Sequence, residues 1–217
     1  RKYLKWRKLM TKIKLCGLRR ECDIMYVNEL LPDYIGFIFA EKSKRFVSVK
    51  EAEKLGKKLD ERIIPVGVFV DAPIDFIASI VDREIIRAVQ LHGKEDNQYI
   101  KELRKKVDCT IIKAFRIESE ADVKAAEESL ADYVLLDSGA GTGETFDWSL
   151  INNIKRDYFL AGGLTPENVT EAIKTLHPFG VDASSSLEKD GYKDKDKMEA
   201  FVKAVLSVDN KKCWQVL

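Results

Sequence analysis

The 217-residue sequence has little that could bind a metal ion and no run that could cross a membrane. It contains four cysteines and two histidines, and no two cysteines form a CxxC pair. A zinc site, which needs several such ligands at short spacing, is therefore not predicted. No pattern indicates the disulfide framework of a secreted domain, so we expect a cytoplasmic protein. No apolar stretch approaches the ~20 residues that a membrane-spanning helix needs.

An excess of charge is also missing. Lys and Arg number 37 and Asp and Glu number 36, so no overall field favours nucleic acid or a membrane as partner. The first nine residues are an exception, being basic with scattered aromatics, but they lack the apolar segment and cleavage site of a signal peptide. We interpret residues 1–9 as a basic N-terminal appendage ahead of a natural start at Met10. A basic surface-binding arm is the alternative.

From residue 10 to residue 207 the sequence alternates between two kinds of segment. Short runs rich in Ile, Val and Phe predict strands, and longer stretches with helical spacing lie between them. The predicted strands are 13–16, 35–39, 64–70, 88–91, 110–115, 133–136, 158–161 and 181–183. The predicted helices are 21–31, 49–59, 74–81, 98–105, 120–130, 148–154, 166–176 and 195–206. Residues 208–217 are expected to form a C-terminal tail.

Eight strand–helix units of roughly 25 residues each are the number expected for a closed (β/α)8 barrel. We therefore predict an α/β protein, a TIM barrel of eight parallel strands with an outer ring of helices. An open doubly wound sheet would show the same alternation of strands and helices. Only the count of eight distinguishes the two.

Two charged residues within predicted strands need partners, because strands of a parallel barrel are buried on both faces. The alternation that directs Cys16 inward also directs Lys14 inward, one step deeper. The same argument, starting from Ser184, directs Asp182 inward at the same depth. Strands one and eight are neighbours in a closed barrel, so we predict a buried ion pair between Lys14 and Asp182 below the active site.

The stretch from Asp137 to Trp148 has the character of a ligand-binding loop. A predicted strand ends in the carboxylate of Asp137, and three glycines follow within a few positions. Glycine-rich backbone lets N–H groups approach an anion, and active sites of this architecture lie at the carboxyl ends of the strands. Asp137 thus stands where a catalytic acid is expected. A solvated loop with a helix-capping aspartate is the plainer interpretation.

Small residues also follow the last two predicted strands, where this architecture repeatedly forms a phosphate site. The lysine-bearing P-loop pattern is missing, so a nucleoside triphosphate is not indicated. The loops after the predicted strands 133–136, 158–161 and 181–183 together fit a phosphate monoester. The alternative is that their small residues simply form ordinary turns. The predicted phosphate-binding residues are Gly141, Thr142, Gly143, Gly162, Gly163, Ser184 and Ser185.

Four further residues lie within, at the end of or after predicted strands. Cys16 is either a small core residue or, beside a cation, a general base. Arg45 closes a basic run that could simply be a solvated face, but a guanidinium suits a carboxylate ligand. His92 is either a substrate contact or a residue of the barrel wall. Lys113 is a further possible substrate contact, because an unpaired lysine in a buried strand is costly.

These motifs, taken together and in order, resemble the phosphoribosylanthranilate isomerase family. The resemblance extends from about Thr11 to about Leu206. Two departures stand out: Ser186 replaces the usual glycine of the phosphate loop, and the first helix lacks a small polar cap. The motifs that carry the resemblance are 12–17, 36–39, 42–46, 66–70, 89–93, 135–138, 141–143, 146–148, 161–168 and 180–185.

The resemblance implies an Amadori rearrangement of N-(5-phosphoribosyl)anthranilate to 1-(2-carboxyphenylamino)-1-deoxyribulose 5-phosphate, a step of tryptophan biosynthesis. It implies that Cys16 is the general base, that Asp137 is the general acid and that Arg45 holds the anthranilate carboxylate. No metal or organic cofactor is expected, since the cationic imine nitrogen of the substrate accepts the electrons. The implied partner is a small-molecule phosphosugar, with other tryptophan-pathway enzymes as candidate protein partners.

Other functions stay open from the sequence alone. A ribulose-phosphate epimerase shares the phosphosugar chemistry, but the two histidines argue against its metal site. An indole-glycerol-phosphate synthase is expected to need a catalytic lysine, for which Lys113 is the one candidate. A barrel without catalytic activity that binds a phosphorylated ligand is the third alternative.

Overall fold

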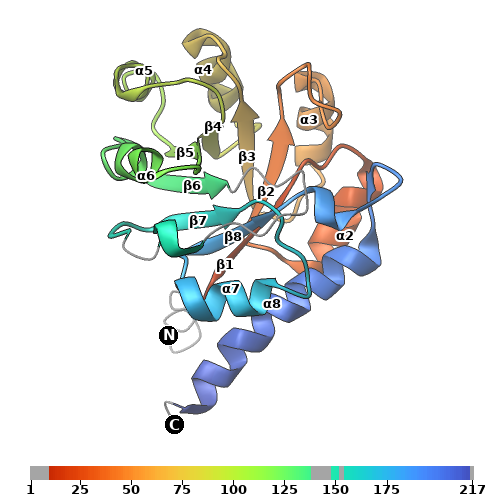
Figure 1. The fold of residues 1–217 in the computed structure, drawn as a ribbon. Helices are drawn as coiled ribbons and strands as arrows, with labels where there is room; N and C mark the ends of the chain where they lie inside the picture. Colours follow the sequence, from red (N-terminus) through yellow and green to blue (C-terminus); the bar gives the residue numbers. More distant parts are fainter. Residues whose placement is uncertain (1–9, 138–147, 152–153, 216–217) are drawn as a thin grey trace.

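The computed structural model describes residues 10–137, 148–151 and 154–215, with side chains described as far as Val208. Its eight parallel strands follow one another in chain order around a closed barrel, and β8 pairs with β1 (Figure 1). The predicted TIM barrel is therefore confirmed, and the open sheet is not what forms. The barrel strands are β1 (Lys12–Cys16), β2 (Tyr34–Ile38), β3 (Ile64–Phe69), β4 (Ala88–Leu91), β5 (Thr110–Arg116), β6 (Tyr133–Asp137), β7 (Tyr158–Ala161) and β8 (Gly180–Ala183).

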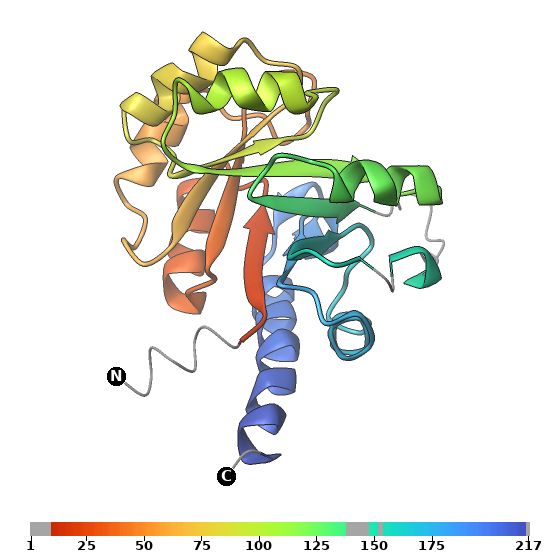
Figure 2. The same cartoon turned by 90° about the vertical axis from the view of Figure 1, so that its left-hand side faces the viewer.

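Helices surround this barrel, and a small two-stranded hairpin follows β8. Helix α8 lies along the barrel and extends past its end (Figure 2). Among the described residues, none of the helices combines the length and the apolar character that a membrane span requires. The outer elements are α2 (Glu21–Leu30), α3 (Val49–Gly56), α4 (Ile74–Asp82), α5 (Asn97–Arg104), α6 (Glu120–Glu127), η1 (Trp148–Ile151), α7 (Val169–Leu176), η2 (Ser185–Leu187), β9 (Glu188–Lys189), β10 (Tyr192–Lys193) and α8 (Lys195–Gln215).

Each strand prediction holds to within one residue at both ends, whereas several helices differ in length. Helix α3 stops at Gly56, a poor helix former, instead of residue 59. Helix α6 stops before Ser129, whose hydroxyl accepts a hydrogen bond from the N–H of Ala131 and so competes with the helix. Helix α8 continues from the predicted end at residue 206 to Gln215, since no proline or glycine interrupts it. It thus crosses the expected boundary of the C-terminal tail.

Two other helix predictions are wrong, one in the type of helix and one in the residue at which the helix begins. The segment 148–154 forms only the short 3₁₀ turn Trp148–Ile151, and residues 152–153 lie outside the described part. Helix α7 begins at Val169 instead of residue 166. The Asn168 side chain accepts from the N–H of Thr165 and donates to the carbonyl of Gly163, which holds the preceding residues in a turn.

Helix α2 lacks a small polar residue at its start, as the sequence shows, and Asp23 compensates. Its carboxylate accepts hydrogen bonds from the backbone N–H groups of Arg19 and Arg20 at 3.0 Å. Two otherwise unpaired donors are thereby satisfied from inside the first helical turn.

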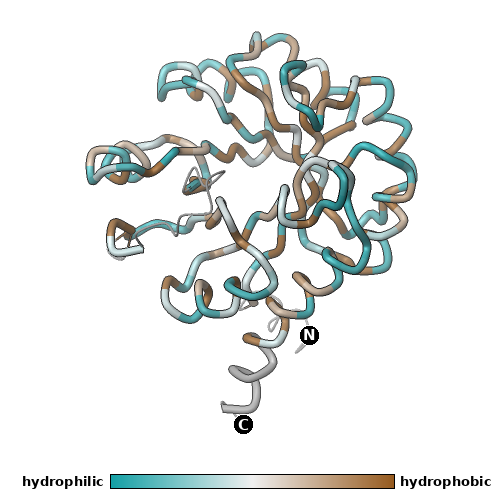
Figure 3. The backbone as a smooth tube through the Cα atoms, turned by 45° about the vertical axis from the view of Figure 1, so that its right-hand side comes forward, coloured by the Kyte–Doolittle hydropathy of each residue, from teal (hydrophilic) through white to brown (hydrophobic). Residues whose placement is uncertain are grey.

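Alternation along the strands divides the core in two. Outward-facing apolar residues pack against the helices, and the apolar backbone segments in Figure 3 concentrate on the strands. Inward-facing residues fill the barrel at its amino end around Phe159, whose ring meets the edges of Tyr34 and Phe179 at centroid distances of 5.4 and 5.3 Å. The inner cluster is formed by Tyr34, Val66, Ala88, Ile112, Ala114, Leu135, Phe159 and Ala161. These side chains fill the amino end of the barrel, and a cavity is left at the carboxyl ends of the strands.

Candidate active site

A cavity of about 390 Å³ opens at the carboxyl ends of the strands. Its wall combines an apolar side on β2 and β3, a polar side on β4, β6 and β8, and small residues from the loops after β7 and β8. The lining residues are Cys16, Ile38, Ala40, Ser43, Arg45, Val68, Val70, Gln90, His92, Asp137, Ala161, Gly162, Gly163, Leu164, Asp182, Ala183, Ser184, Ser185 and Ser186. The cavity therefore brings together eight of the residues predicted from the sequence: Cys16, Arg45, His92, Asp137, Gly162, Gly163, Ser184 and Ser185.

Cys16, the last residue of β1, is 5% exposed and a free thiol. The neighbouring strand makes room for its sulfur with Gly36, where a Cβ would lie 2.5 Å from Sγ. Burial raises the pKa of the Cys16 thiol above its ordinary value of 9.0. The ammonium groups of Lys14 and Lys193 act to lower that pKa, and Asp182 acts to raise it. The thiol thus stands among opposing charges that decide how readily it ionises.

Directly below Cys16, the predicted ion pair is present. Lys14 Nζ lies 2.9 Å from Asp182 Oδ1, and the two residues are paired in register between β1 and β8. Burial alone would lower the pKa of Lys14, but the carboxylate of Asp182 raises it above the ordinary value. The lysine is thereby kept as a cation at the floor of the cavity.

On the opposite wall, Asp137 ends β6 with its side chain 29% exposed, and His92 faces it from the end of β4. His92 Nε2 lies 3.9 Å from Asp137 Oδ2, and His92 Nδ1 lies 3.1 Å from the amide nitrogen of Gln90. With Gln90 as donor, Nδ1 accepts and Nε2 carries the proton that points toward Asp137. Burial lowers the pKa of His92, which favours this neutral imidazole, although Asp137 opposes the shift.

Arg45 occupies the rim of the cavity in the segment after β2. Its guanidinium makes a bidentate pair with Glu188 of β9, with Nε–Oε1 and Nη2–Oε2 distances of 2.5 and 2.8 Å. The Arg45 side chain passes over Gly17, which adopts φ +85° and has no Cβ to collide with it. Burial works against the charge of Glu188, but Arg45 and Lys193 outweigh it and hold the pKa of that carboxyl below the ordinary value.

The loops after β7 and β8 supply small residues, as predicted. Gly162 and Gly163 both have positive φ, at 84° and 63°. Ser184 donates its hydroxyl hydrogen to the carbonyl of Cys16 at 3.0 Å. Ser186 is not among the described residues with positive φ, so the backbone there accommodates serine in place of glycine. Gly141, Thr142 and Gly143 lie outside the described residues.

Lys113 does not line the cavity, and its expected contact with substrate has no support in the geometry. It alternates with Ile112 and Ala114, which point into the barrel, so its own side chain points toward the helices. There its ammonium lies 3.2 Å from the buried carboxylate of Glu95 and donates to the carbonyl of Gly93 at 2.7 Å. The cost of burying this lysine is offset by an ion pair in the outer layer.

Three functional or structural partners were not found from the sequence: Glu95, Glu188 and Lys193. Glu188 and Lys193 lie in a stretch of mixed charge after the serine run, where no spacing distinguishes them from ordinary surface residues. Their role depends on the hairpin β9–β10, which brings Glu188 to Arg45 and Lys193 to Ser184, two residues that line the cavity. Among the described residues, no group of three or more His, Cys, Asp or Glu side chains could hold a metal ion.

Comparison with known proteins gives a consistent result. Residues 13–204 match the family described as N-(5'phosphoribosyl)anthranilate (PRA) isomerase. The N-(5'-phosphoribosyl)anthranilate isomerase of Caldanaerobacter subterraneus subsp. tengcongensis is 45% identical over 206 residues, which cover 92% of this chain and all of the relative.

Two solved structures extend this similarity to the fold. Phosphoribosyl anthranilate isomerase from Thermotoga maritima superposes with a TM-score of 0.83 at 35% identity, covering 91% of this chain and all of the other. A phosphoribosyl anthranilate isomerase in complex with reduced 1-(o-carboxyphenylamino)-1-deoxyribulose 5-phosphate gives a TM-score of 0.81 at 35% identity and the same coverage.

Proposed function

The chain belongs to the N-(5'-phosphoribosyl)anthranilate isomerase family, and from that premise we propose how its residues carry out the reaction. As a member of this family it is an isomerase of tryptophan biosynthesis. The epimerase, synthase and non-catalytic alternatives are therefore set aside. The substrate of the proposed mechanism is N-(5-phosphoribosyl)anthranilate, a phosphosugar joined to an aromatic amine.

The cavity supports one orientation of that substrate. Its phosphate binds at the loops after β7 and β8, where Gly162, Gly163, Ser184 and Ser185 lie. Its carboxylate binds at the rim beside Arg45, and the apolar side of the cavity receives the aromatic ring. Holding both ends places the sugar carbons between β1 and β6, which removes much of the entropic cost of aligning the reacting groups.

The chemistry then divides between two residues. Asp137, carrying a proton, donates it to the ring oxygen of the ribose, so the furanose opens to a Schiff base. Cys16, as thiolate, removes the proton from C2, and the electron pair moves toward the cationic imine nitrogen to form an enolamine. Tautomerisation of the enolamine gives the ketone. The imine of the substrate is itself the electron sink, so the steps proposed here need no group beyond the side chains.

The observation that carries this proposal is that Cys16 and Asp137 line the same cavity from β1 and β6, with Arg45 at its rim. The experiment generates phosphoribosylanthranilate in situ and follows the loss of its anthranilate-type fluorescence, with and without chelator. Turnover by the wild-type protein in both conditions supports the proposal. Full activity of a Cys16→Ser or Asp137→Asn variant would refute the role assigned to that residue.

Other expectations from the sequence stay predictions. These are the cytoplasmic location, the association with other tryptophan-pathway enzymes, and the division of the chain into residues 1–9, 10–207 and 208–217.

A further inference from the structure

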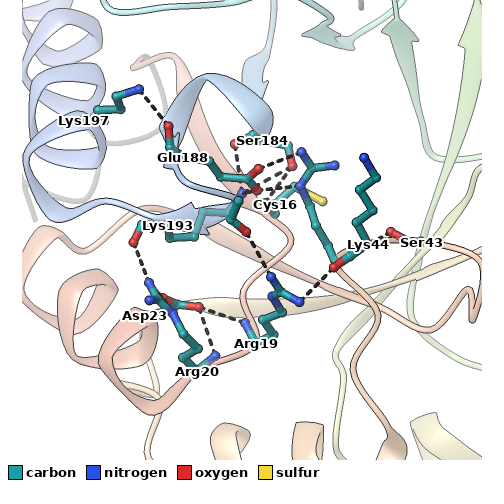
Figure 4. A network of polar contacts seen from close by, with 12 residues as sticks. Cys16, Arg19, Arg20, Asp23, Ser43, Lys44, Ser184, Glu188, Lys193 and Lys197 are labelled. Atoms are coloured by element: carbon teal, nitrogen blue, oxygen red, sulfur yellow. Dashed lines mark hydrogen bonds and ion pairs between the residues drawn. The ribbon is translucent and has the colours of Figure 1, made fainter.

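Lys193 of β10 is a buried lysine that the mechanism above does not use. Its side chain is 1% exposed. A buried ammonium is costly unless all its donors are satisfied, so its partners indicate why it is there. Lys193 Nζ lies 2.7 Å from Glu188 Oε1, 2.9 Å from the carbonyl of Ser184 and 3.4 Å from the Ser184 hydroxyl (Figure 4). Three acceptors for three N–H groups indicate the protonated amine.

Through two partner residues, Glu188 and Ser184, Lys193 is linked to three parts of the active site. Glu188 uses the oxygen that contacts Lys193 to hold Arg45 as well, so Lys193 and Arg45 share one carboxylate. Ser184 belongs to the predicted phosphate loop and donates its hydroxyl hydrogen to the carbonyl of Cys16. Lys193 therefore connects the carboxylate-binding arginine, the phosphate loop and the strand that carries the general base.

The charges around Arg45 indicate what Lys193 contributes to binding a substrate carboxylate. A bidentate pair between Arg45 and Glu188 alone would be neutral and would attract a substrate carboxylate only weakly. Lys193 adds a positive charge, so two cations and one anion leave the rim of the cavity with one net positive charge. The bidentate contact with Glu188 fixes the plane of the guanidinium, while the charge of Lys193 preserves its attraction for an anion.

The same ammonium acts on Cys16. The charged groups that interact electrostatically with the thiol are Lys14 on its own strand, Asp182 on β8, Arg45 after β2 and Lys193 on β10. Lys193 acts against the effect of burial by lowering the pKa of Cys16. Burial also lowers the pKa of Lys193, while the carboxylate of Glu188 opposes that loss of charge.

The hairpin that carries Lys193 is held from outside by two arginines. Arg20 donates to the carbonyl of Lys193 at 2.5 Å, and Arg19 donates to the carbonyls of Gly191 and Lys44 at 3.0 and 2.9 Å. Both guanidinium carbons lie 4.7 Å from the centroid of the Tyr192 ring. These contacts join the hairpin to the segments after β1 and β2 and hold Lys193 beside Glu188 and Ser184 (Figure 4).

We propose that Lys193 is a positioning residue of the isomerase reaction. It sets the geometry and charge of the Arg45–Glu188 pair for the substrate carboxylate, and it stabilises the thiolate of Cys16. The proposal rests on the function proposed above and adds to it a residue that touches neither reacting carbon.

The test compares Lys193→Met with Lys193→Arg, and uses Lys189→Met, an exposed lysine of the same hairpin, as matched control. Lys193→Met is expected to raise KM by about tenfold or more, the effect of losing one charge-assisted contact. It should also move the acidic limb of the kcat/KM profile to higher pH, because Cys16 loses a stabilising cation. Lys193→Arg keeps the positive charge, so its KM and pH profile should lie between those of Lys193→Met and of the wild type. Lys189→Met should behave as wild type. A folded Lys193→Met protein with unchanged KM and unchanged pH profile would overturn the proposal.

Two further measurements keep the outcome interpretable. Lys193→Gln keeps a hydrogen-bond donor near Ser184 but not the charge, so wild-type kinetics in this variant would also overturn the proposal if Lys193→Met does not fold. Ultraviolet absorbance of the thiolate, titrated without substrate and referenced to Cys16→Ser, reports the ionisation of Cys16 alone. If the thiolate of Cys16 forms at higher pH in Lys193→Gln than in the wild type, the electrostatic role of Lys193 is supported even if the assigned reaction were wrong. An unchanged titration of Cys16 contradicts that role.

Discussion

The ammonium of Lys14 and the carboxylate of Asp182 lie 2.9 Å apart inside the closed barrel, with side-chain exposures of 0% and 10%. This pair joins the first and last strands directly below the thiol of Cys16. It occupies the level at which the inward-facing side chains change from apolar packing to the polar wall of the cavity.

Because the pair is buried, removing one partner leaves the other charge without compensation. Lys14→Met is expected to lower the free energy of unfolding by about 3–5 kcal/mol, measured by urea denaturation. Lys12→Met on the same strand is the control. Its partner Asp33 lies 3.1 Å away with both side chains partly exposed, so the loss should stay below about 1 kcal/mol.

The double variant Lys14→Met/Asp182→Leu shows whether the loss of stability in Lys14→Met comes from the unpaired charge of Asp182 or from lost packing. Replacing both charges by apolar side chains should recover most of the stability, since no charge then remains buried without a partner. A double variant as unstable as Lys14→Met alone would contradict this account.

Replacing Cys16 by serine should remove nearly all turnover while leaving the fold intact. A serine hydroxyl does not ionise in the accessible pH range, so the proposed general base is lost and kcat should fall by about 10²–10⁴-fold. The fluorescence assay measures turnover and circular dichroism checks the fold. Cys109→Ser, just before β5 at the other end of the barrel, should retain full activity.

The ionisation of Cys16 predicts how activity and stability depend on pH. Burial raises its pKa above 9.0, so the thiol form prevails near neutrality and the thiolate fraction grows as the pH rises. In the free enzyme kcat/KM should therefore increase with pH toward that value. Stability should change in the opposite direction. A group whose pKa is higher in the folded than in the unfolded state stabilises the folded protein at low pH. That contribution is lost as the pH rises through the pKa of the group in the folded state.

A series of kcat/KM measurements, paired with urea denaturation at each pH, tests both signs. The wild-type protein should lose stability above pH 9.0 relative to Cys16→Ser, in which the thiol is missing. Parallel stability curves for the two proteins across this range would show that Cys16 does not titrate as the structure indicates.

Arg45→Ala should act mainly on substrate binding. The guanidinium is expected to contact the carboxylate in the ground state and in the transition state alike, so KM should rise with little change in kcat. Losing a charge-assisted hydrogen bond of about 2 kcal/mol corresponds to a rise in KM of roughly thirtyfold. Lys44→Ala, an exposed neighbour in the same basic run, is the control and should leave KM unchanged. A large fall in kcat at unchanged KM would place Arg45 in the chemical steps instead.

Much of the fold could be predicted because its signals are local. Strand positions follow from runs of Ile, Val and Phe, and eight such runs indicate a closed barrel. Closure itself makes β1 and β8 neighbours, which is why the pairing of Lys14 with Asp182 could be predicted from closure together with alternation along the strands. Helix ends were less predictable. The turn before Val169 depends on the side chain of Asn168, and the end of α6 depends on the hydroxyl of Ser129.

The sequence by itself determined the barrel, the inward direction of Cys16 and the small residues after β7 and β8, since each depends on neighbours along one strand. Only the tertiary structure decided that Lys113 faces Glu95 in the outer layer and that Glu188 and Lys193 fold back over Arg45. These contacts join side chains from separate strands, loops and a hairpin. Each buried charge needs a partner of opposite charge, and the folded structure determines which one lies within reach. Local sequence patterns carry no information about that partner.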